Sequence, residues 1–512
     1  MAEALGPISA HRVEAWLAPR VTTPRRLFLW SLGAGLLAAL GHAPFNLWPV
    51  AVLGYALIFS LFRLARSARA AMLVGWGAGT GHFALALNWI VEPFLVDLVR
   101  HGWMSPFAIV FLSTGLALFW GAALGLARFA GGRPLVFMVA LALAELIRSY
   151  IFTGFPWALI GHGLIASPFL QYAAWVGPHG LTLLMLLMAV SLWRLAGPRP
   201  WAGFVLMPVY GALLFAGIQI GQPVLPAPDA PVIRLVQPNA AQHLKWQPEY
   251  IPEFYRRMME ATAATPEGPA PALIVWPETA LPVLLENAGN ILPRIAQAGG
   301  ASPVLLGVQR FDGPRLYNSA VLLDGQGAVT ALYDKYHLVP FGEYMPLGDL
   351  LAEWGIHGLA ATEGQGYSAG PGAQLIEVPG IGPALPLICY EAIFPQDVSA
   401  APKRPRFLLQ ITNDAWFGKA SGPYQHLAQA RLRTVEQGLP MVRVANTGVS
   451  AMIGPKGNVQ AQIALNEQGW IDAVLPVTLA PTPYARAGDL PFLILFMALI
   501  AAVIVRRRLI GR

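Results

Sequence analysis

Long apolar runs separated by short polar loops occupy the first 220 residues of the chain, and one more lies near its C-terminus. About 20 apolar residues suffice for a helix to cross a bilayer, with some tolerance for shorter runs. The runs are Leu27–Leu40, Trp48–Leu64, Ala71–Val91, Phe107–Leu126, Pro134–Tyr150, Phe169–Trp193, Trp201–Ile220 and Leu490–Val505. The pattern therefore predicts a multi-pass α-helical membrane domain with about eight transmembrane helices.

The pattern changes between the seventh and eighth apolar runs, where short β-rich runs alternate with helical ones. Expected strands are Val232–Val236, Ala272–Trp276, Val304–Val308, Ala320–Leu323, Ala384–Ile388, Phe407–Ile411 and Met441–Ala445. Expected helices are Pro248–Thr265, Asn287–Ala298, Ile393–Ala400 and His426–Gln437. Buried strands with helices between them predict a layered α/β domain.

These two patterns and the proline-rich stretches between them predict the domain boundaries. The expected division is 1–220 for transmembrane helices 1–7, 221–231 for a linker, 232–477 for the α/β domain, 478–489 for a second linker, 490–506 for transmembrane helix 8 and 507–512 for a cytoplasmic tail.

Composition agrees with a membrane protein, because 55% of the residues are hydrophobic and only 12% are charged. The net charge of +7 does not indicate a nucleic-acid partner, since the arginines lie in short loops between apolar runs. Arginines precede the first run and recur in the second, fourth and sixth loops, and Arg506-Arg507-Arg508 follows the last run. By the positive-inside rule, both termini are predicted to be cytoplasmic and the α/β domain to lie on the opposite side.

The chain contains a single cysteine, Cys389, directly after the apolar run Ala384–Ile388. An isolated cysteine is most often a small buried hydrophobic residue. Its position at a strand end, with Tyr390 and Glu391 directly after it, also allows the sulfur to face a cleft. With one cysteine there is no intramolecular disulfide, so cysteine pairing does not indicate the compartment.

Charged residues elsewhere in the α/β domain suit thiol chemistry. Glu278 follows the strand Ala272–Trp276, where it could equally be a helix-capping acid. Lys335 lies in the run Tyr333–Tyr344, which by itself could be a surface loop, and Asn413 follows another expected strand.

Together, Glu278, Lys335 and Cys389 supply what acyl transfer through a thiol needs. A cysteine is mostly protonated at neutral pH and requires a base or a nearby cation. The oxyanion that forms on the attacked carbonyl requires positive charge or N–H donors. No metal ligands with plausible spacing occur, and neither a metal nor a cofactor is expected.

These motifs resemble the Glu–Lys–Cys signature of the nitrilase superfamily. Trp276-Pro277-Glu278, the segment from Asp334 to Pro346, and Cys389-Tyr390-Glu391 carry that resemblance. The flanking motifs resemble the membrane-bound branch, the apolipoprotein N-acyltransferase family; they are Asn413–Gly418, Asn446-Thr447-Gly448, Thr482–Arg486, Ala43-Pro44-Phe45, Asn88-Trp89 and Phe155-Pro156-Trp157.

The resemblance implies an αββα sandwich for the α/β domain and a location in the bacterial inner membrane, with that domain in the periplasm. It implies that an acyl chain passes from a phospholipid, typically phosphatidylethanolamine, through a Cys389 thioester to the α-amino group of an apolipoprotein's diacylglyceryl-cysteine. Glu278 would be the base, and Lys335 with the Tyr390 backbone N–H would hold the oxyanion.

Five further residues are supporting candidates on the same resemblance. Glu343 would orient Lys335 or the amine, and Trp246 would belong to a mobile flap at the entrance. Tyr390, Glu391 and Asn413 would lie beside the catalytic residues.

Two other functions are compatible with parts of the sequence. A membrane-tethered nitrilase or amidase could use the same three residues on a small amide, but it would need one anchoring helix rather than eight. A transporter with an accessory domain would be favoured by ionisable residues within the spans. Few occur there: Glu92, Asp97, Glu145 and Arg148 all fall near predicted span ends or loops.

Overall fold

The structure, a computed structural model, describes residues 11–346 and 366–510. Its internal contacts divide the chain into two compact units. The first lies within Met1–Val91, His101–Gly221 and Arg486–Arg512, and the second within Glu92–Arg100 and Gln222–Ala485. The short segment Glu92–Arg100 thus associates with the second unit, although it belongs to the predicted membrane domain.

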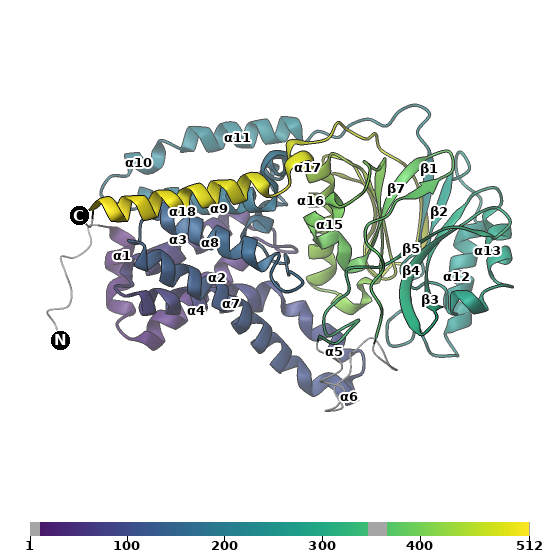
Figure 1. Cartoon of the computed structure of the whole chain (residues 1–512), viewed down its shortest axis with the longest axis horizontal. Coiled ribbons are helices and arrows are strands. Elements are labelled where there is room, and N and C mark those ends of the chain that lie inside the picture. Colours follow the sequence, from purple (N-terminus) through teal and green to yellow (C-terminus); the bar gives the residue numbers. More distant parts are fainter. Residues whose placement is uncertain (1–10, 347–365, 511–512) are drawn as a thin grey trace. The chain divides into compact units, whose positions relative to one another are not determined.

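The first unit is helical, and each of the eight predicted apolar runs contains a helix (Figure 1). The helices that cover these runs are α2 Pro24–Ala39, α3 Trp48–Leu64, α4 Ala68–Ala86, α7 Ser105–Phe129, α8 Pro134–Arg148, α9 Ala173–Leu195, α10 Trp201–Phe204, α11 Met207–Ile220 and α18 Leu490–Ile510. Shorter helices are α1 Arg12–Leu17, α5 Glu92–Leu95 and α6 Leu98–His101.

Length and apolarity support fewer membrane crossings than the sequence predicts. Among the described residues, Leu98–Phe129, Pro168–Leu195 and Trp201–Ile220 are long and apolar enough to span a membrane. A fourth crossing results if Ala68–Ala86 and Asn88–Leu95, which are bent by 65°, form one broken span. Helix α3 and the segment Leu490–Ala502 are apolar but shorter. Eight crossings therefore stay a prediction.

Two of the ionisable residues in the helical unit pair with each other in its interior. Arg148 Nη2 donates to Glu145 Oε2 at 3.0 Å, and both side chains are buried. Glu145 also accepts from Trp120 Nε1 and from the backbone N–H of Ile160. Because the pair is neutral overall and both carboxylate oxygens and the Arg148 Nη1 atom bond neighbouring segments, we interpret it as a packing element of this unit.

The second unit contains two six-stranded sheets. The first has the order β12-β1-β2-β3-β4-β5, and the second β11-β10-β9-β8-β7-β6. Their strands are β1 Val232–Gln237, β2 Leu273–Val275, β3 Val304–Asp312, β4 Arg315–Leu323, β5 Val329–Asp334, β6 Ile376–Val378, β7 Gly382–Ile388, β8 Phe407–Thr412, β9 Met441–Ala445, β10 Ser450–Ile453, β11 Val459–Ile463 and β12 Gly469–Val474. Strands β1, β2 and β3 are parallel, as are β7, β8 and β9.

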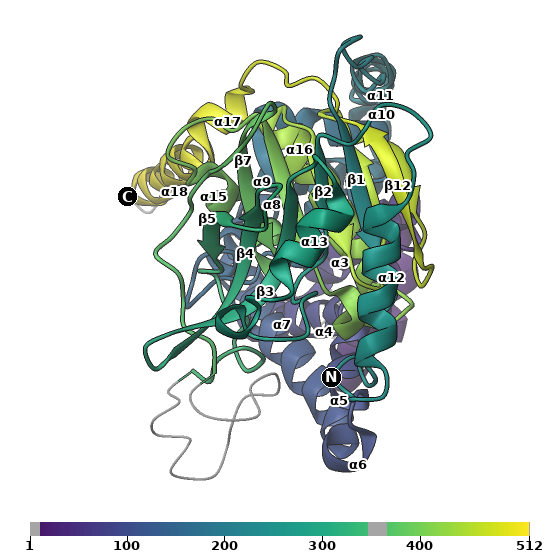
Figure 2. The ribbon, with the colours of Figure 1, turned by 90° about the vertical axis from the view of Figure 1, so that its right-hand side faces the viewer.

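Helices cover the outer face of each sheet, so the unit has four layers (Figures 1 and 2). Helices α12 (Ile251–Ala263) and α13 (Leu292–Gly299) pack their apolar side chains on the first sheet. Helices α15 (Pro395–Ser399) and α16 (Gly422–Gln437) do the same on the second sheet. The layered α/β fold predicted from the sequence is confirmed, with one core on each side of the sandwich.

All seven expected strands and four expected helices occur, but five strands were not expected. Strands β5, β6, β10, β11 and β12 lack a long apolar run. Four of them, β5, β6, β11 and β12, are edge strands, where only part of each strand is buried and the apolar signal weakens. Strand β10 is buried but only four residues long. Helix α17 (Pro483–Ala487) lies in the stretch predicted to be the second linker.

Candidate active site

The side chains of the candidate site follow the ends of strands in both sheets. Glu278 comes shortly after β2, Lys335 directly after β5, and Cys389 directly after β7. Strand β8 lies parallel to β7, so Asn413 emerges beside Cys389. Loops at the carboxyl ends of parallel strands are where α/β folds place their sites.

Cys389 lies at a sharp turn between β7 and the 3₁₀ helix Cys389–Ile393. Its φ of +52° is in the left-handed region, which a non-glycine residue occupies only when its surroundings enforce it. Ile388 is the last residue of the strand, and its backbone N–H donates to Glu391 Oε2 at 2.7 Å. The carboxylate that follows the cysteine thus ties the turn back to the strand.

The Glu278 carboxylate accepts hydrogen bonds from both sheets. Asn318 Nδ2 of β4 donates to Oε1 at 2.7 Å, and the Asn413 backbone N–H donates to Oε2 at 2.8 Å. Lys245 Nζ donates to the Glu278 carbonyl at 3.3 Å and to Thr279 Oγ1 at 2.8 Å. These bonds hold both the carboxylate and the backbone of Glu278 in one orientation.

Lys335 lies between two carboxylates. Its Nζ donates to Glu343 Oε1 at 2.8 Å and is 4.0 Å from Glu278 Oε1. Glu343 Oε2 in turn accepts from the Val339 backbone N–H. Although burial lowers the pKa of Lys335, the charges of Glu343 and Glu278 outweigh it and raise that pKa, so the side chain is a cation. Glu343 therefore contacts Lys335, and its role in orienting Lys335 or the amine stays a prediction.

Burial and neighbouring charges set the protonation of the other two groups. Burial and the Glu278 carboxylate raise the pKa of the Cys389 thiol, while Lys335 lowers it. Burial also raises the pKa of Glu278, against the lowering effect of Lys335. The resting site therefore holds a neutral thiol beside a carboxylate whose raised pKa suits a general base.

Glu391 joins the loop that carries Lys335 to the turn that carries Cys389. It accepts from the backbone N–H groups of Tyr336 and His337 at 2.9 and 3.2 Å, and from the Tyr333 hydroxyl at 2.9 Å. The Tyr390 ring packs against His337 and Phe394. Both residues therefore lie beside the predicted catalytic groups, and their supporting roles stay predictions.

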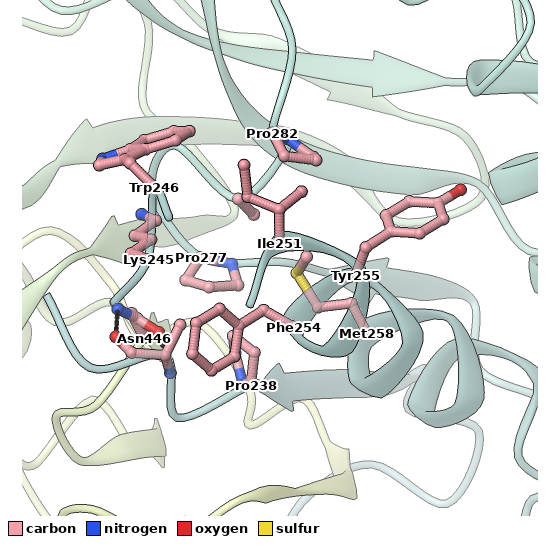
Figure 3. Close-up of a pocket in the computed structure, with 12 residues that line it drawn as sticks. Pro238, Lys245, Trp246, Ile251, Phe254, Tyr255, Met258, Pro277, Pro282 and Asn446 are labelled. Atoms are coloured by element: carbon pink, nitrogen blue, oxygen red, sulfur yellow. Dashed lines mark hydrogen bonds between the residues drawn. The ribbon is translucent and has the colours of Figure 1, made fainter. Parts of the chain in front are cut away.

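An apolar pocket is lined in part by Pro277, the residue directly before Glu278 (Figure 3). Its lining includes Trp246 and Lys245 from the loop after β1, Pro277 next to Glu278, and apolar side chains of α12. Trp246 is 42% exposed. It lines the pocket, and its role as a flap stays a prediction.

Asn413 lies within a set of linked amides. Its Nδ2 donates to Gln242 Oε1 at 2.7 Å, and its Oδ1 accepts from Asn446 Nδ2 at 2.8 Å. Asn446 also exchanges two hydrogen bonds with the backbone of Ala240. These bonds connect the loops after β1, β8 and β9, so they fix the Asn413 backbone N–H that reaches Glu278.

Two residues next to Glu278 were not found from the sequence. Asn318 belongs to β4 and Lys245 to the loop after β1, and neither follows an apolar run that could mark a strand end. In the sequence, Asn318 is recognisable only as a polar residue just before the apolar run Ala320–Leu323. Polar residues are common at such positions, so this one did not indicate a site. In the described ranges 11–346 and 366–510, no group of three or more His, Cys, Asp or Glu side chains is arranged to hold a metal ion.

Comparisons with known proteins give matches over both units. A family model described as the apolipoprotein N-acyltransferase N-terminal domain matches residues 34–191, and one described as carbon-nitrogen hydrolase matches residues 233–484.

Relatives named apolipoprotein N-acyltransferase match nearly end to end. One from Rhodopseudomonas palustris is 36% identical, covering 93% of this chain and 95% of the relative. Another from Caulobacter vibrioides is 38% identical, covering 94% of each. Among solved structures, an amidase mutant from Nesterenkonia sp. AN1 is 20% identical with a TM-score of 0.36, covering 49% of this chain and 93% of the amidase, which is too weak for a functional argument.

Proposed function

The chain belongs to the apolipoprotein N-acyltransferase family, and from this premise we propose how its site transfers an acyl chain to a lipoprotein. The enzyme acts in the N-acylation of lipoproteins. The proposed acyl donor is a phospholipid such as phosphatidylethanolamine, and the proposed acceptor is the α-amino group of a diacylglyceryl-cysteine. Glu278, Lys335 and Cys389 are the proposed catalytic residues.

In the first half-reaction, the Cys389 sulfur attacks the ester carbonyl of the phospholipid and its proton passes to Glu278. The oxyanion is stabilised by the Lys335 ammonium and by the Tyr390 backbone N–H. When the intermediate collapses, the bond between the carbonyl carbon and the glycerol oxygen breaks. Glu278 returns its proton to that oxygen, and the lysophospholipid leaves behind a thioester.

In the second half-reaction, the neutral amine of the diacylglyceryl-cysteine attacks the thioester carbonyl and gives a proton to Glu278. The same donors hold the second oxyanion. The carbon–sulfur bond then breaks, Glu278 protonates the leaving sulfur, and the acceptor departs as an amide. The thiol is regenerated, so the cycle follows a ping-pong scheme.

The observation that carries this mechanism is the position of Lys335. Its Nζ is 2.8 Å from Glu343 and 4.0 Å from Glu278, and its charge lowers the pKa of the Cys389 thiol. One fixed cation thus lowers the pKa values of both the base and the nucleophile. That arrangement suits a reaction in which negative charge moves from thiolate to carbonyl oxygen.

Both substrates carry acyl chains that reside in a bilayer. We infer that the α/β unit works at the periplasmic surface of the inner membrane, since a charged site deep in hydrocarbon would be costly. The apolar helices of the first unit support a membrane location, and the arginine pattern of the loops supports the orientation.

Intact-mass measurement of the full-length enzyme tests the proposal. Incubation with phospholipid alone should add one acyl chain to wild type and nothing to Cys389→Ala. A diacylglyceryl-cysteine peptide should then discharge the chain onto its amine. Rapid release of free fatty acid without an acceptor would indicate a hydrolase instead, and failure to acylate Cys389 would contradict the mechanism itself.

A further inference from the structure

Four polar side chains behind Cys389 have no part in the mechanism above. They are Gln410 of β8, Asp414 of the 3₁₀ helix Asp414–Phe417, His426 of α16 and Arg443 of β9. All four are completely buried. Burying such groups is costly unless each one is hydrogen-bonded or paired, so their partners indicate what the group achieves.

The four side chains form a closed ring. Arg443 donates to Gln410 Oε1 through Nη1 and to Asp414 Oδ2 through Nη2, the latter at 2.5 Å. His426 Nδ1 lies 2.9 Å from Asp414 Oδ1, and Gln410 Nε2 lies 2.9 Å from His426 Nε2. Outside the ring, Asp414 Oδ1 accepts from Thr412 Oγ1 at 2.9 Å and Arg443 Nε donates to the Val449 carbonyl at 3.2 Å. Toward the active site, the ring meets the Cys389 carbonyl.

The direction of each hydrogen bond follows from what each group can donate. Arginine only donates, so Gln410 turns its oxygen toward Arg443 and its NH₂ group to the other side. Burial and the charge of Arg443 lower the pKa of His426, so its ring is neutral. With Nδ1–H donated to Asp414, the His426 Nε2 atom accepts.

Gln410 is therefore the donor to the Cys389 carbonyl. One hydrogen of its NH₂ group goes to His426 Nε2, and the other goes to the Cys389 oxygen at 3.1 Å. His426 Nε2 is itself 3.2 Å from that oxygen, which places the Gln410 nitrogen against both acceptors. Arg443, Asp414 and His426 thus fix the orientation of the Gln410 amide.

The Cys389 carbonyl shares a peptide unit with the Tyr390 N–H. In a planar trans peptide the C=O and N–H bonds point in opposite directions, so fixing one fixes the other. Because Cys389 has a left-handed φ, the peptide after it turns away from the direction of β7. The carbonyl of this peptide therefore needs another hydrogen-bond partner to hold its orientation. A hydrogen bond to the carbonyl also polarises the N–H of the same peptide.

We propose that Gln410, oriented by Arg443, His426 and Asp414, is a positioning residue for the oxyanion: it holds the Cys389 carbonyl and thereby aims the Tyr390 N–H at the reacting carbonyl oxygen. The inference rests on the proposed function, because it assumes that Cys389 forms the thioester. Gln410 touches neither the substrate nor the sulfur in this role.

Two reactions of the same thiol test the proposal. Thioester formation from phospholipid passes through an oxyanion, whereas alkylation of Cys389 by iodoacetamide does not. In full-length Gln410→Met enzyme in detergent, single-turnover acylation should slow by at least about tenfold, and by no more than the roughly 10²–10³-fold cost of losing one oxyanion donor. The alkylation rate should stay close to that of wild type across the same pH range.

Two further variants separate positioning from stability. Gln437→Met is the matched control: it makes the same exchange at a buried glutamine that lies in α16 and bonds Ser399 rather than the active site. It should leave the acylation rate and the alkylation rate unchanged. His426→Asn retains a donor for Asp414 but lacks the Nε2 atom that holds Gln410, so it should show a smaller loss of acylation with normal alkylation. If Gln410→Met does not fold, this second variant decides.

Equal loss of acylation and alkylation would overturn the proposal, because the ring would then support the thiol or the fold rather than the oxyanion. Unchanged acylation in both ring variants would overturn it as well. A wild-type enzyme that forms no thioester on Cys389 would instead contradict the proposed function, so the two failures are distinguishable.

Discussion

At the scale of single residues, the site depends on one buried cation between two carboxylates. Lys335 lies 2.8 Å from Glu343 and 4.0 Å from Glu278, and it is almost completely buried. Its charge lowers the pKa values of both Glu278 and Cys389. In the proposed mechanism, the same ammonium stabilises the oxyanion and favours the ionised form of Glu278.

Lys335→Met should therefore have two effects on acylation. Loss of an oxyanion donor should slow thioester formation by about 10²–10³-fold at neutral pH. Without the cation, the pKa of Glu278 rises further, so the base becomes ionised only at higher pH and the pH–rate profile should shift upward. Single-turnover acylation across pH measures both effects. An unshifted profile would mean that Lys335 does not set the ionisation of Glu278.

At the scale of secondary-structure elements, β3 approaches the turn that carries Glu278 closely enough to exclude any side chain. A Cβ atom on Gly307 would lie 2.5 Å from the Thr279 nitrogen and 2.6 Å from the Glu278 Cα. Both atoms belong to backbone, and Thr279 has a left-handed φ of +44°. The turn after β2 is thus packed directly on its neighbouring strand.

Gly307→Ala should displace Glu278 and slow thioester formation strongly, because misplacement by about 1 Å can cost about 10²-fold in rate. Gly268→Ala is the matched control, since no atom lies within 4 Å of its added Cβ and its φ is not left-handed. Acylation by the two purified variants is compared with wild type. Normal acylation by Gly307→Ala would show that the turn moves without affecting the base.

At the scale of the whole molecule, the charges of the loops predict the orientation in the membrane. The arginines before the first apolar run and the triplet Arg506-Arg507-Arg508 after the last one both favour cytoplasmic termini. A donor phospholipid and a lipoprotein on the outer surface would then meet the α/β unit directly. This orientation requires that the chain cross the membrane an odd number of times before residue 222.

A reporter that is active only in the cytoplasm should be silent when fused after Gly325. That residue lies in the α/β unit between β4 and β5, away from the catalytic side chains. A fusion after Arg66, in the second loop, should be active and serves as the control. Cytoplasmic activity of the Gly325 fusion would reverse the predicted orientation.

The residue pattern alone predicted the two-part organisation, the ends of β2 and β7, and the three candidate catalytic residues. Apolar runs report burial directly, and they ended next to Glu278 and Cys389, where β2 and β7 end. Strand β5, which precedes Lys335, escaped prediction because it lies at the edge of its sheet and its first residues are exposed. Lys335 was nevertheless identified, because the motif around it resembles the nitrilase signature.

Only the tertiary structure decided which distant residues support the site. Gln410, His426 and Arg443 look in the sequence like isolated polar residues within a strand, a helix and another strand. The parallel register of β8 and β9 places Gln410 opposite Arg443, and α16 brings His426 against them. Likewise, Asn318 reaches Glu278 across 40 residues of sequence. Hydrogen bonds between segments depend on strand register and helix packing, and local residue patterns carry no information about either.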